Sequence, residues 1–385
     1  MATQNILVIT ELFLPTKGGS AVWFGEVYGR LGGENTHIVT ADVEGAADYD
    51  KTHPNTIHRV HLKRVPWLKP ESLVMYIKLL FQAIKVCSTH KIDTIHAGRV
   101  LPEGLVALLV GRLFAKQVVI YAHGEEITTW RQPGKFKVMC FTYRHADKII
   151  ANSEFTQNEL LKLNINSDRI TLISPGVDIE RFKPGLPFAD LHQQINLKKG
   201  QQLILSVGRL SRRKGFDQVI KALPALIKEG IDVQYAIIGI GEDKEYLQNL
   251  VNENRGSDRV HLLGHVEMSD LPRWYNACNI FAMPNREING DTEGFGMVFI
   301  EAGACSKPVI SGIAGGTGAA VMHNKTGLRV EGNSLESVSK ALNKLLLDIN
   351  YQNTLGSNAL LRVRENFSWD AVAMLTKRGI LQCEK

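Results

Sequence analysis

Residues 280–304 read IFAMPNREINGDTEGFGMVFIEAGA, a short apolar run, a glycine-containing turn and a second apolar run. The first run, Ile280–Met283, predicts a buried strand, and the second, Met297–Ala304, predicts a buried helix. The turn predicts a ligand site, because glycine lets the backbone approach a ligand and a helix start offers unpaired N–H groups to phosphate. Glu293 in the turn and Glu301 further along the helix can each accept hydrogen bonds from hydroxyl groups. Together they favour a sugar joined through diphosphate to a nucleoside.

Apolar runs of this kind alternate with helical stretches along the whole chain. Many are continuous Ile, Val and Leu runs, which is typical of strands buried on both faces of a parallel sheet. The alternation predicts an α/β fold with doubly wound, Rossmann-like sheets. We expect strands at residues 5–10, 37–41, 57–62, 94–97, 118–122, 148–151, 170–173, 203–207, 234–238, 260–263, 280–283 and 309–311.

A chain of 385 residues predicts two domains. The Pro- and Gly-containing segments Ser174–Asp178 and Lys183–Pro187 form the expected linker. We therefore expect a first domain at residues 1–173 and a second at 174–366, facing each other across a central cleft. A C-terminal helix is expected within about residues 367–385, with Trp369–Leu381 as its helical stretch. We expect it to pack back on the first domain.

The composition is that of a soluble globular protein, with 44% hydrophobic and 22% charged residues. No apolar stretch approaches the roughly 18–20 residues that cross a bilayer, and the first ten residues resemble a strand more than a leader. The five cysteines are odd in number and form no Cys-x-x-Cys pair, so neither a disulfide framework nor a zinc site is expected. These features predict a cytoplasmic protein.

One basic segment stands out from a modest net charge of +6. Between Lys51 and Lys91 there are eight Lys or Arg residues and one acid, Glu71, together with Trp67 and the amphipathic run Leu73–Val86. Residues 58–90 can contact an anionic membrane surface, which would place the protein on the inner face of the plasma membrane. The alternative is a helix packed on its own sheet with a solvated basic edge. No recognised nucleic-acid module accompanies the charge, so no nucleic-acid partner is expected.

Several polar residues follow directly after expected strands, where ligands of doubly wound sheets bind. Arg209 ends the run 203–209 and Lys214 follows in a short loop, so both can neutralise a departing diphosphate, whereas Arg212 and Arg213 are expected to face solvent. An ordinary basic loop is the alternative for this cluster.

Three further strand ends are more ambiguous. Gly18-Gly19 can contact phosphate or acceptor, or can simply form a tight turn. His123 can bond a sugar hydroxyl, or can be a satisfied structural histidine. The segment Gly312–Gly318 can approach the donor or merely turn the chain. The chain has no Gly-x-x-x-x-Gly-Lys-Ser/Thr phosphate loop. It also has no Gly-x-Gly-x-x-Gly at the start of the first helix, which argues against NAD.

The order of these motifs resembles that of the retaining, nucleotide-sugar-dependent glycosyltransferases of family 4, which have the GT-B fold. The resemblance takes in bacterial exopolysaccharide, phosphatidylinositol-mannosyltransferase and cyanobacterial heterocyst-envelope polysaccharide enzymes. The matching segments span the chain and comprise Gly18-Gly19, His123-Gly124, Asn152-Ser153, Pro175–Asp178, Gly208-Arg209 with Lys214, Gly264–Val266, Pro284–Arg286, Glu293–Glu301 and Asn324–Gly327.

The resemblance implies a role for each matching residue. Arg209 and Lys214 would bind the donor diphosphate, and Glu293 would contact the 3- and 4-hydroxyls of the sugar. Glu301 would hold the ribose, and Val266 would meet the base through its backbone. The remaining implied contacts are main-chain groups of Gly294, Phe295 and Gly296 near the sugar, amides of Met297 and Val298 on phosphate, His123 near the 6-hydroxyl and the anomeric centre, and Gly18 and Gly19 near phosphate and acceptor.

The implied catalytic set is therefore Arg209, Lys214, Glu293 and His123, with no metal and no other cofactor. One segment departs from the family: where many relatives have Gly-Gly-x-Pro-Glu, this chain has Gly315-Gly316-Thr317-Gly318-Ala319. Any role of that glutamate is absent, which leaves the local donor contacts open.

The implied reaction transfers a hexosyl group to a hydroxyl of a saccharide or a lipid-linked saccharide. UDP-glucose is the expected donor, with GDP-mannose as the alternative. Two other classes stay open: an isomerase resembling UDP-N-acetylglucosamine 2-epimerase, and a non-catalytic nucleotide-sugar-binding protein.

Overall fold

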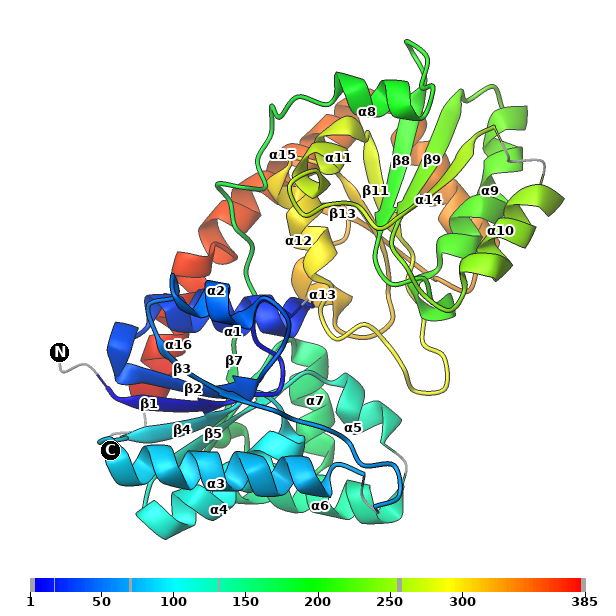
Figure 1. Ribbon diagram of the computed structural model, residues 1–385. Helices are drawn as coiled ribbons and strands as arrows, with labels where there is room; N and C mark the ends of the chain where they lie inside the picture. Colours follow the sequence, from blue (N-terminus) through cyan, green and yellow to red (C-terminus); the bar gives the residue numbers. More distant parts are fainter. Residues whose placement is uncertain (1–3, 17, 69–70, 131, 255–257, 382–385) are drawn as a thin grey trace. The chain divides into compact units, whose positions relative to one another are not determined.

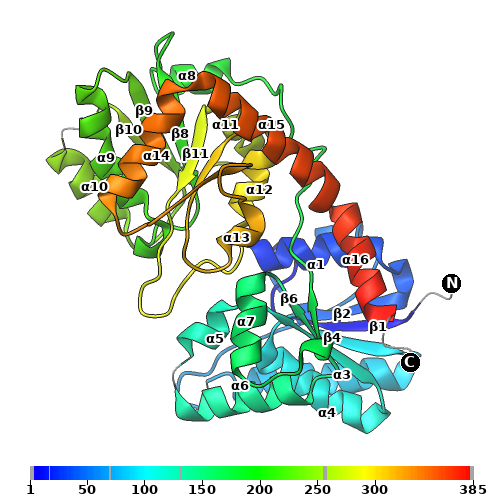
Figure 2. The ribbon, with the colours of Figure 1, turned by 180° about the vertical axis from the view of Figure 1, so that it is seen from behind.

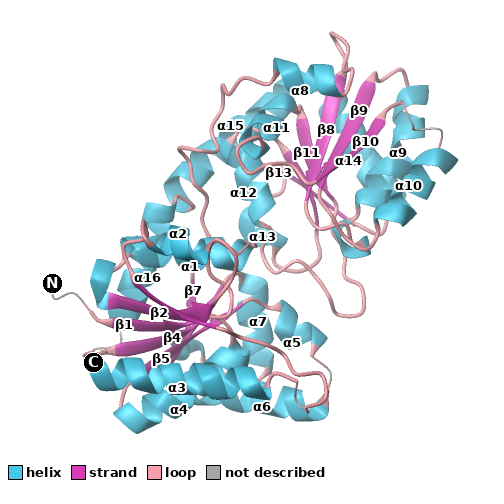
Figure 3. Cartoon of the chain, in the orientation of Figure 1, coloured by secondary structure: helices cyan, strands magenta, loops and turns pink. Residues whose placement is uncertain are grey.

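The continuous apolar runs form two separate parallel sheets in the computed structural model, one in each of two units of the chain (Figure 3). The structure describes residues 4–16, 18–68, 71–130, 132–254 and 258–381. The first unit contains residues 1–175 and 369–385, and the second contains residues 176–368. The sequence placed the first of these divisions at residues 173/174.

The first sheet has seven strands in the order β3-β2-β1-β4-β5-β6-β7, all paired in parallel. Its interior strands are apolar on both faces; Ile6–Ile9 is buried at every position. The strands are β1 (Ile6–Ile9), β2 (Thr36–Ala41), β3 (Thr56–Val60), β4 (Thr94–Ala97), β5 (Gln117–Ala122), β6 (Lys148–Ala151) and β7 (Ile170–Leu172). Because β3 ends at Val60, the start of the basic stretch predicted at residues 58–90 is part of this sheet.

Helices cover both faces of the first sheet (Figure 1). Helices α3, α4 and α6 lie along one face, and α1, α2 and α16 lie along the other. The helices of this unit are α1 (Gly19–Arg30), α2 (Ala46–Asp50), α3 (Leu73–Thr89), α4 (Leu105–Phe114), α5 (Glu125–Thr129), α6 (Pro133–His145), α7 (Glu154–Lys162) and α16 (Trp369–Leu381).

The last helix, α16, packs beside α1 near the other end of the chain (Figure 2). Arg30 on α1 donates from Nε to Asp370 Oδ1 at 2.8 Å. The first unit is thus completed by the C-terminal helix. In the sequence, the second unit is inserted between residue 175 and α16.

The second sheet has six strands in the order β10-β9-β8-β11-β12-β13, again all parallel. The edge strand β13 was not predicted from the sequence, because it is short and carries the polar Arg329. The strands are β8 (Gln202–Val207), β9 (Val233–Ile238), β10 (Val260–Gly264), β11 (Ile280–Met283), β12 (Val309–Gly312) and β13 (Gly327–Val330).

The connecting segments of the second unit are mainly helical, as a doubly wound sheet requires. Helix α9 packs against both α10 and α14, and α12 packs against α15. The helices are α8 (Ala189–Gln194), α9 (Phe216–Lys228), α10 (Lys244–Glu253), α11 (Leu271–Ala277), α12 (Met297–Ala304), α13 (Thr317–Ala320), α14 (Leu335–Leu347) and α15 (Ile349–Asn366). The predicted helix at Met297–Ala304 has the observed bounds.

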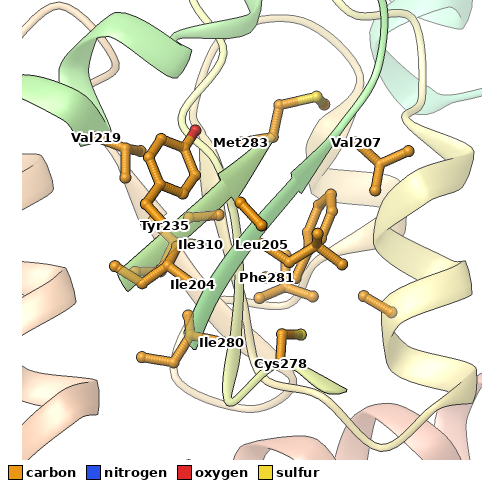
Figure 4. Packing of buried hydrophobic residues seen from close by; sticks show 14 of the residues in the cluster. Ile204, Leu205, Val207, Val219, Tyr235, Cys278, Ile280, Phe281, Met283 and Ile310 are labelled. Carbon is orange, nitrogen blue, oxygen red and sulfur yellow. The ribbon is translucent and has the colours of Figure 1, made fainter. Parts of the chain in front are cut away.

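The core of the second unit is built on the inner strands β8 and β11 (Figure 4). Leu205 and Phe281 are fully buried and belong to neighbouring strands that pair in register. Tyr235 on β9 is also buried, and its hydroxyl lies 2.6 Å from Ser206 Oγ. A rigid, close-packed sheet of this kind fixes where the loops at its strand ends begin.

Each sheet reverses its strand order at one point, between β1 and β4 in the first and between β8 and β11 in the second. Loops that leave the carboxyl ends of the two strands at such a point diverge, and the crevice between them is the usual ligand site of this architecture. The loops after β8 and β11, together with helix α12, contain most of the predicted donor residues.

Candidate functional site

The strongest convergence of charged side chains lies at the strand reversal of the second sheet. Lys214 follows β8 and donates from Nζ to Glu293 Oε2, which follows β11. Arg213 Nη1 donates to the same carboxylate oxygen at 3.0 Å, and its Nε lies 3.1 Å from Asp291 Oδ2. Lys214 and Arg213 precede Glu293 by 79 and 80 positions in the sequence, yet both contact its carboxylate.

This carboxylate is ionised in spite of its surroundings. Burial alone would raise the pKa of Glu293, but the charges and hydrogen bonds of Lys214 and Arg213 outweigh it, and the pKa is lowered. Glu293 and Lys214 are mostly buried, with 14% and 12% of their side chains exposed. Glu293 is thus an ionised acceptor at neutral pH, and its Oε2 already accepts from two cationic side chains.

Arg213 corrects one sequence interpretation. It was expected to face solvent, yet only 18% of its side chain is exposed. Its neighbour Arg212 is nearer to the expectation, with 47% exposure, an ion pair to Asp243 and a stacking contact over the Tyr246 ring.

Arg209 has a different acidic partner from Lys214. Its side chain is 74% exposed and donates to Glu242, which follows β9, at 2.9 Å. A Cβ on Gly208, the residue before Arg209, would lie 3.8 Å from Lys214 Cε, so the two cations leave the end of β8 beside each other.

The loops that hold these residues pass so close to one another that only glycine fits. A Cβ on Gly215, where φ is +77°, would lie 2.1 Å from the carbonyl oxygen of Pro284. A Cβ on Gly239 would lie 1.8 Å from that of Gly208, and one on Gly312 would lie 1.6 Å from that of Asn285. The ends of β8, β9, β11 and β12 are consequently packed as one layer.

Polar contacts brace the same layer from inside. Arg286 Nη2 donates to both carboxylate oxygens of the buried Asp217 at 3.0 Å, and Arg286 N–H donates to the carbonyl of Arg213 at 2.8 Å. Asn285 accepts from Gly312 N–H at 3.0 Å and donates to Ala314 O. The motif Pro284–Arg286 thus fixes the path of the loop that presents Arg213.

The segment that departs from the family pattern has a structural part here. Gly316 N–H donates to the main-chain oxygen of Glu293 at 2.7 Å, and a Cβ on Gly315 would lie 2.3 Å from that oxygen. Thr317 Oγ1 donates to Gly312 O at 2.7 Å. The glycines at 315 and 316 hold the backbone of Glu293 in place.

Helix α12 begins at Met297, four residues after Glu293. Gly296 precedes it with φ at +90°, and a Cβ there would lie 2.4 Å from the Phe299 ring. Phe295 is buried and anchors the turn, and Gly294 is partly exposed. The first-turn amides at Met297 and Val298 have no intrahelical acceptor by helix geometry, so this end of α12 favours an anion.

Glu301 lies on α12 and accepts a hydrogen bond from Tyr275 Oη at 2.7 Å. Burial raises its pKa, with the Tyr275 hydroxyl and Arg181 acting in the opposite direction. Val266, in the loop after β10, is partly buried against the core of the unit. Tyr275 is a contact of this site that the sequence did not single out, because no motif marks it.

In the first unit, His123 follows β5 and is held on several sides. Its Nε2 lies 2.8 Å from Gly98 O, and its main-chain N–H donates to Glu126 Oε1. Its carbonyl accepts from Asn152 Nδ2 at 3.0 Å, and the Trp23 ring stands edge-on at 5.9 Å. Such a histidine is rigidly positioned.

Gly18 and Gly19 lie at the start of α1, the helix that contributes Trp23. Gly18 has φ at +142°, and helix α1 begins at Gly19. Both glycines are accessible rather than buried. The described residues thus place Gly18, Gly19 and His123 in one unit and the remaining candidate residues in the other.

Family models match both units of the chain. The model described as Glycosyltransferase Family 4 matches residues 18–181, and the one described as Glycosyl transferases group 1 matches residues 187–362. A GDP-mannose-dependent alpha-(1-6)-phosphatidylinositol monomannoside mannosyltransferase of Mycobacterium tuberculosis is 30% identical over 378 residues, 96% of each chain. The chain belongs to this glycosyltransferase family.

Other members of the family are similar over the same length. A GDP-mannose-dependent monoacylated alpha-(1-6)-phosphatidylinositol monomannoside mannosyltransferase of Corynebacterium glutamicum is 29% identical over 391 residues, covering 100% of this chain and 99% of the other. The glycosyltransferase resemblance inferred from the sequence motifs is confirmed.

Solved structures confirm the fold. Anabaena HepE in complex with UDP and glucose superposes with a TM-score of 0.81 at 19% identity, covering 98% of this chain and all of the other. Sucrose-phosphate synthase of Thermosynechococcus elongatus gives a TM-score of 0.80 at 22% identity, covering 98% and 99%. This glycosyltransferase has the predicted GT-B fold of two Rossmann-like parallel-sheet domains.

Proposed function

We propose that this glycosyltransferase moves a hexosyl group from a nucleoside-diphosphate sugar to a hydroxyl of a saccharide or lipid-linked saccharide in polysaccharide or glycolipid synthesis. The observation that carries the proposal is the Lys214–Glu293–Arg213 cluster beside the start of α12. Cationic side chains and unpaired amides at one strand reversal suit a diphosphate, and the carboxylate suits sugar hydroxyls.

The cluster supports a specific sequence of contacts. Without donor, Glu293 neutralises Lys214 and Arg213. An arriving diphosphate offers these cations a second anion, which frees lone pairs of Glu293 for the sugar hydroxyls. Lys214 then stabilises the charge that grows on the leaving phosphate. Glu301 is partly accessible on α12 and in the same proposal holds the ribose.

We further propose that the anomeric configuration is retained without a protein nucleophile or a metal. Glu293 is ion-paired to two cations, which makes its carboxylate a poor nucleophile. The bond between the anomeric carbon and the phosphate oxygen breaks, a bond to the acceptor oxygen forms on the same face, and the acceptor proton passes to the leaving phosphate. The cations of the cluster take the place that a metal would fill.

Donor choice is proposed from the relatives. The relatives of Mycobacterium tuberculosis and Corynebacterium glutamicum, which match over the whole chain at 30% and 29% identity, are named as GDP-mannose-dependent, which favours GDP-mannose. The sequence expectation was UDP-glucose, and it stays as the alternative; HepE, at 19% identity, supports only the fold. The main-chain contact proposed for Val266 can be made to guanine or to uracil, so it does not distinguish the two donors.

A donor panel tests the proposal. The purified chain is incubated with GDP-mannose, UDP-glucose and UDP-N-acetylglucosamine, and the released nucleotide and the sugar products are measured by NMR. Hydrolysis of one donor, in which water takes the place of the acceptor and the first-formed sugar keeps the anomeric configuration, supports the proposal. Epimerised nucleotide sugar would indicate the isomerase class, and binding with neither hydrolysis nor epimerisation would indicate a non-catalytic binder. The roles implied for His123, Gly18 and Gly19 stay predictions, as does Arg209 as a phosphate ligand.

A peripheral membrane position is part of the same proposal, on the cytoplasmic side where nucleotide sugars are made. Within the described residues, no helix is both long and apolar enough to cross a membrane. Helices α3, α4 and α6, on one face of the first sheet, contain no Asp or Glu at all. They carry six Lys or Arg residues: Lys78, Lys85, Arg112, Lys135, Lys137 and Arg144.

Exposed apolar side chains lie among these cations. Phe81 on α3 is 68% exposed and Leu113 on α4 is 64% exposed, while Trp67 in the preceding loop reaches 81%. A hollow of about 350 Å³ at the α4 end is lined in part by Arg112 and Lys116. A basic surface with projecting apolar groups is complementary to anionic lipid. The surface extends beyond the predicted 58–90 stretch, of which Lys69 and Pro70 lie outside the described residues.

Vesicle sedimentation tests this contact. The triple variant Phe81→Ser, Lys85→Gln, Arg112→Gln should bind vesicles of phosphatidylcholine with phosphatidylglycerol about tenfold or more weakly, since each basic residue contributes on the order of 1 kcal/mol. Leu361→Ser, an exposed leucine of the second unit, is the matched control. Equal binding by the triple variant, or no preference of the wild type for anionic vesicles, would contradict a membrane role.

A further inference from the structure

A second polar cluster lies at the strand reversal of the first sheet, between β1 and β4, which the family motifs do not mark. Glu11 follows β1, while Arg99 and Glu103 follow β4. Glu103 is fully buried, and its Oε1 accepts from the main-chain N–H of Glu11 at 3.0 Å. The carboxylate thereby ties the two diverging loops together at the place where this architecture binds its ligands.

Close packing fixes the position of Arg99. Its predecessor Gly98 donates its N–H to Ile9 O at 2.9 Å, and a Cβ at Gly98 would lie 2.5 Å from Thr10 Oγ1. Gly98 O lies 2.8 Å from His123 Nε2. Arg99 therefore begins one residue from the contact that orients His123, at the boundary of β1, β4 and β5.

Among the described residues, the donors of Arg99 are not used up. Its Nε lies 3.5 Å from Glu103 Oε1, and its Nη1 lies 3.9 Å from Glu11 Oε2. Both separations exceed an ordinary hydrogen bond, so the guanidinium is attracted to two carboxylates but keeps N–H groups free to donate. Arg30 is the contrasting case, because it donates at 2.8 Å and 2.5 Å to Asp370 and Glu26.

The same geometry leaves acceptor capacity on the carboxylates. Glu103 Oε2 is buried and has no hydrogen-bond partner within the part of the chain that the structure describes. Glu11 and Arg99 are 22% and 28% exposed, whereas Glu103 is completely covered. An accessible carboxylate and an accessible guanidinium thus stand side by side, supported from below by a buried acid.

The charge of the cluster selects the ligand class. Glu11 and Glu103 flank the guanidinium of Arg99. The charges of Glu125 and Glu126 also act on it, so no net positive charge is left for a phosphate to neutralise. A neutral polyol suits the pair better, because a hydroxyl can donate to Glu11 while its neighbour accepts from Arg99.

We propose that Glu11 and Arg99, braced by Glu103, form a subsite for the acceptor saccharide and bind adjacent hydroxyl groups of its sugar ring. This inference rests on the proposed function, which requires an acceptor but does not say which residues hold it. Glu11 and Arg99 are binding residues in this assignment, and Glu103 is a positioning residue.

Saturation-transfer NMR with methyl α-D-mannopyranoside and methyl β-D-glucopyranoside tests the subsite on the full chain. Wild-type protein should saturate ring protons of at least one glycoside. Arg99→Met and the isosteric Glu11→Gln should each weaken binding by about tenfold, as expected for a lost charge-assisted hydrogen bond. Arg99→Lys keeps the charge but loses the planar fork, so it should bind the glycoside more weakly than the wild type and more tightly than Arg99→Met.

Arg30→Met is the matched control, since it removes an arginine that is also held between two carboxylates of the same unit. It should bind the glycosides as the wild type does. Thermal unfolding of each variant confirms that it is folded. Absence of ring saturation in the wild type, or equal saturation in all variants, would overturn the subsite. The donor panel is a separate measurement and uses no glycoside, so its failure would count against the proposed transfer alone.

Discussion

Lys214 and Glu293 depend on each other at the scale of single residues. Lys214 is mostly buried, and against the effect of burial its charge, together with that of Arg213, lowers the pKa of its partner Glu293. Removing either group leaves a mostly buried charge with fewer partners, which is costly. Substituting Lys214 or Glu293 should consequently reduce stability or activity more than substituting an exposed charge on the same unit.

Lys214→Ala should lower kcat by about 30-fold to 1000-fold, corresponding to roughly 2–4 kcal/mol of lost leaving-group stabilisation. Steady-state kinetics with the preferred donor measures it. Lys228→Ala, an exposed lysine at the end of α9, is the control and should leave kcat unchanged. An unaltered kcat in Lys214→Ala would remove Lys214 from the reaction.

Glu293→Gln should destabilise the chain, because Lys214 and Arg213 then repel each other without a shared anion. A nucleoside diphosphate should replace that anion. GDP or UDP should therefore raise the melting temperature of Glu293→Gln by more than it raises that of the wild type in calorimetry. A smaller rise in the variant would show that the diphosphate does not reach these cations.

The sequence could name Lys214 and Glu293 but not their pairing. The two residues lie 79 positions apart, and their loops meet where the backbone of Gly215 packs closely against Pro284. For the same reason Arg213 was misread as solvent-facing. A local pattern shows that a charge follows a strand, but the neighbouring strand decides which partner it meets.

Elements were easier to predict than contacts. Every strand expected from an Ile-, Val- or Leu-rich run is present, with ends that match or differ by at most two residues. The omission, β13, is a four-residue edge strand interrupted by Arg329. Helix α12 carries the site, and its start depends on one backbone conformation.

Gly296→Ala should destabilise the chain by about 1–3 kcal/mol, because φ is positive and the new methyl meets the Phe299 ring. It should also weaken donor binding by displacing the start of α12. Gly134→Ala, where a Cβ meets nothing within 4 Å, should be neutral or slightly stabilising. Denaturant unfolding and donor titration distinguish the two variants; similar losses in both would contradict a special role for Gly296.

A histidine cluster makes β2, β3 and the end of α3 sensitive to acid. His37 Nδ1 lies 3.1 Å from His58 Nε2, and the His37 ring centroid lies 4.2 Å from that of His90. Burial, with His90 and His58, lowers the pKa of His37 to about 4 from 6.5. Burial, followed by the charges of His90 and of Lys85 on α3, lowers the pKa of His58.

Because the unfolded chain binds these protons more readily, stability should be complete above about pH 6.5 and fall as the pH drops toward 4. His37→Leu should reduce the loss between pH 7 and pH 5, measured by thermal unfolding, whereas His323→Gln in the second unit should not. An unchanged pH dependence in His37→Leu would show that the cluster does not control acid stability.

At the scale of the whole molecule, each unit has its own sheet and its own strand reversal. Saturating GDP should therefore slow hydrogen exchange at residues 208–215 and 294–299 and leave the β1–β7 sheet unchanged. Methyl α-D-mannopyranoside should instead protect residues 98–104. Protection of both regions by either ligand alone would contradict the division of donor and acceptor contacts between the units.

The chain leaves the first unit at residues 175/176 and returns to it at 368/369. The two passages touch: Val177 N–H donates to Phe367 O at 2.8 Å, and Val177 pairs with Ser368. The second unit is therefore encoded by one uninterrupted stretch whose ends already meet. Such a segment can be excised as a single gene fragment or grafted into a surface loop of another host. The first unit lacks this portability, because its C-terminal helix is made only after the whole second unit has been synthesised.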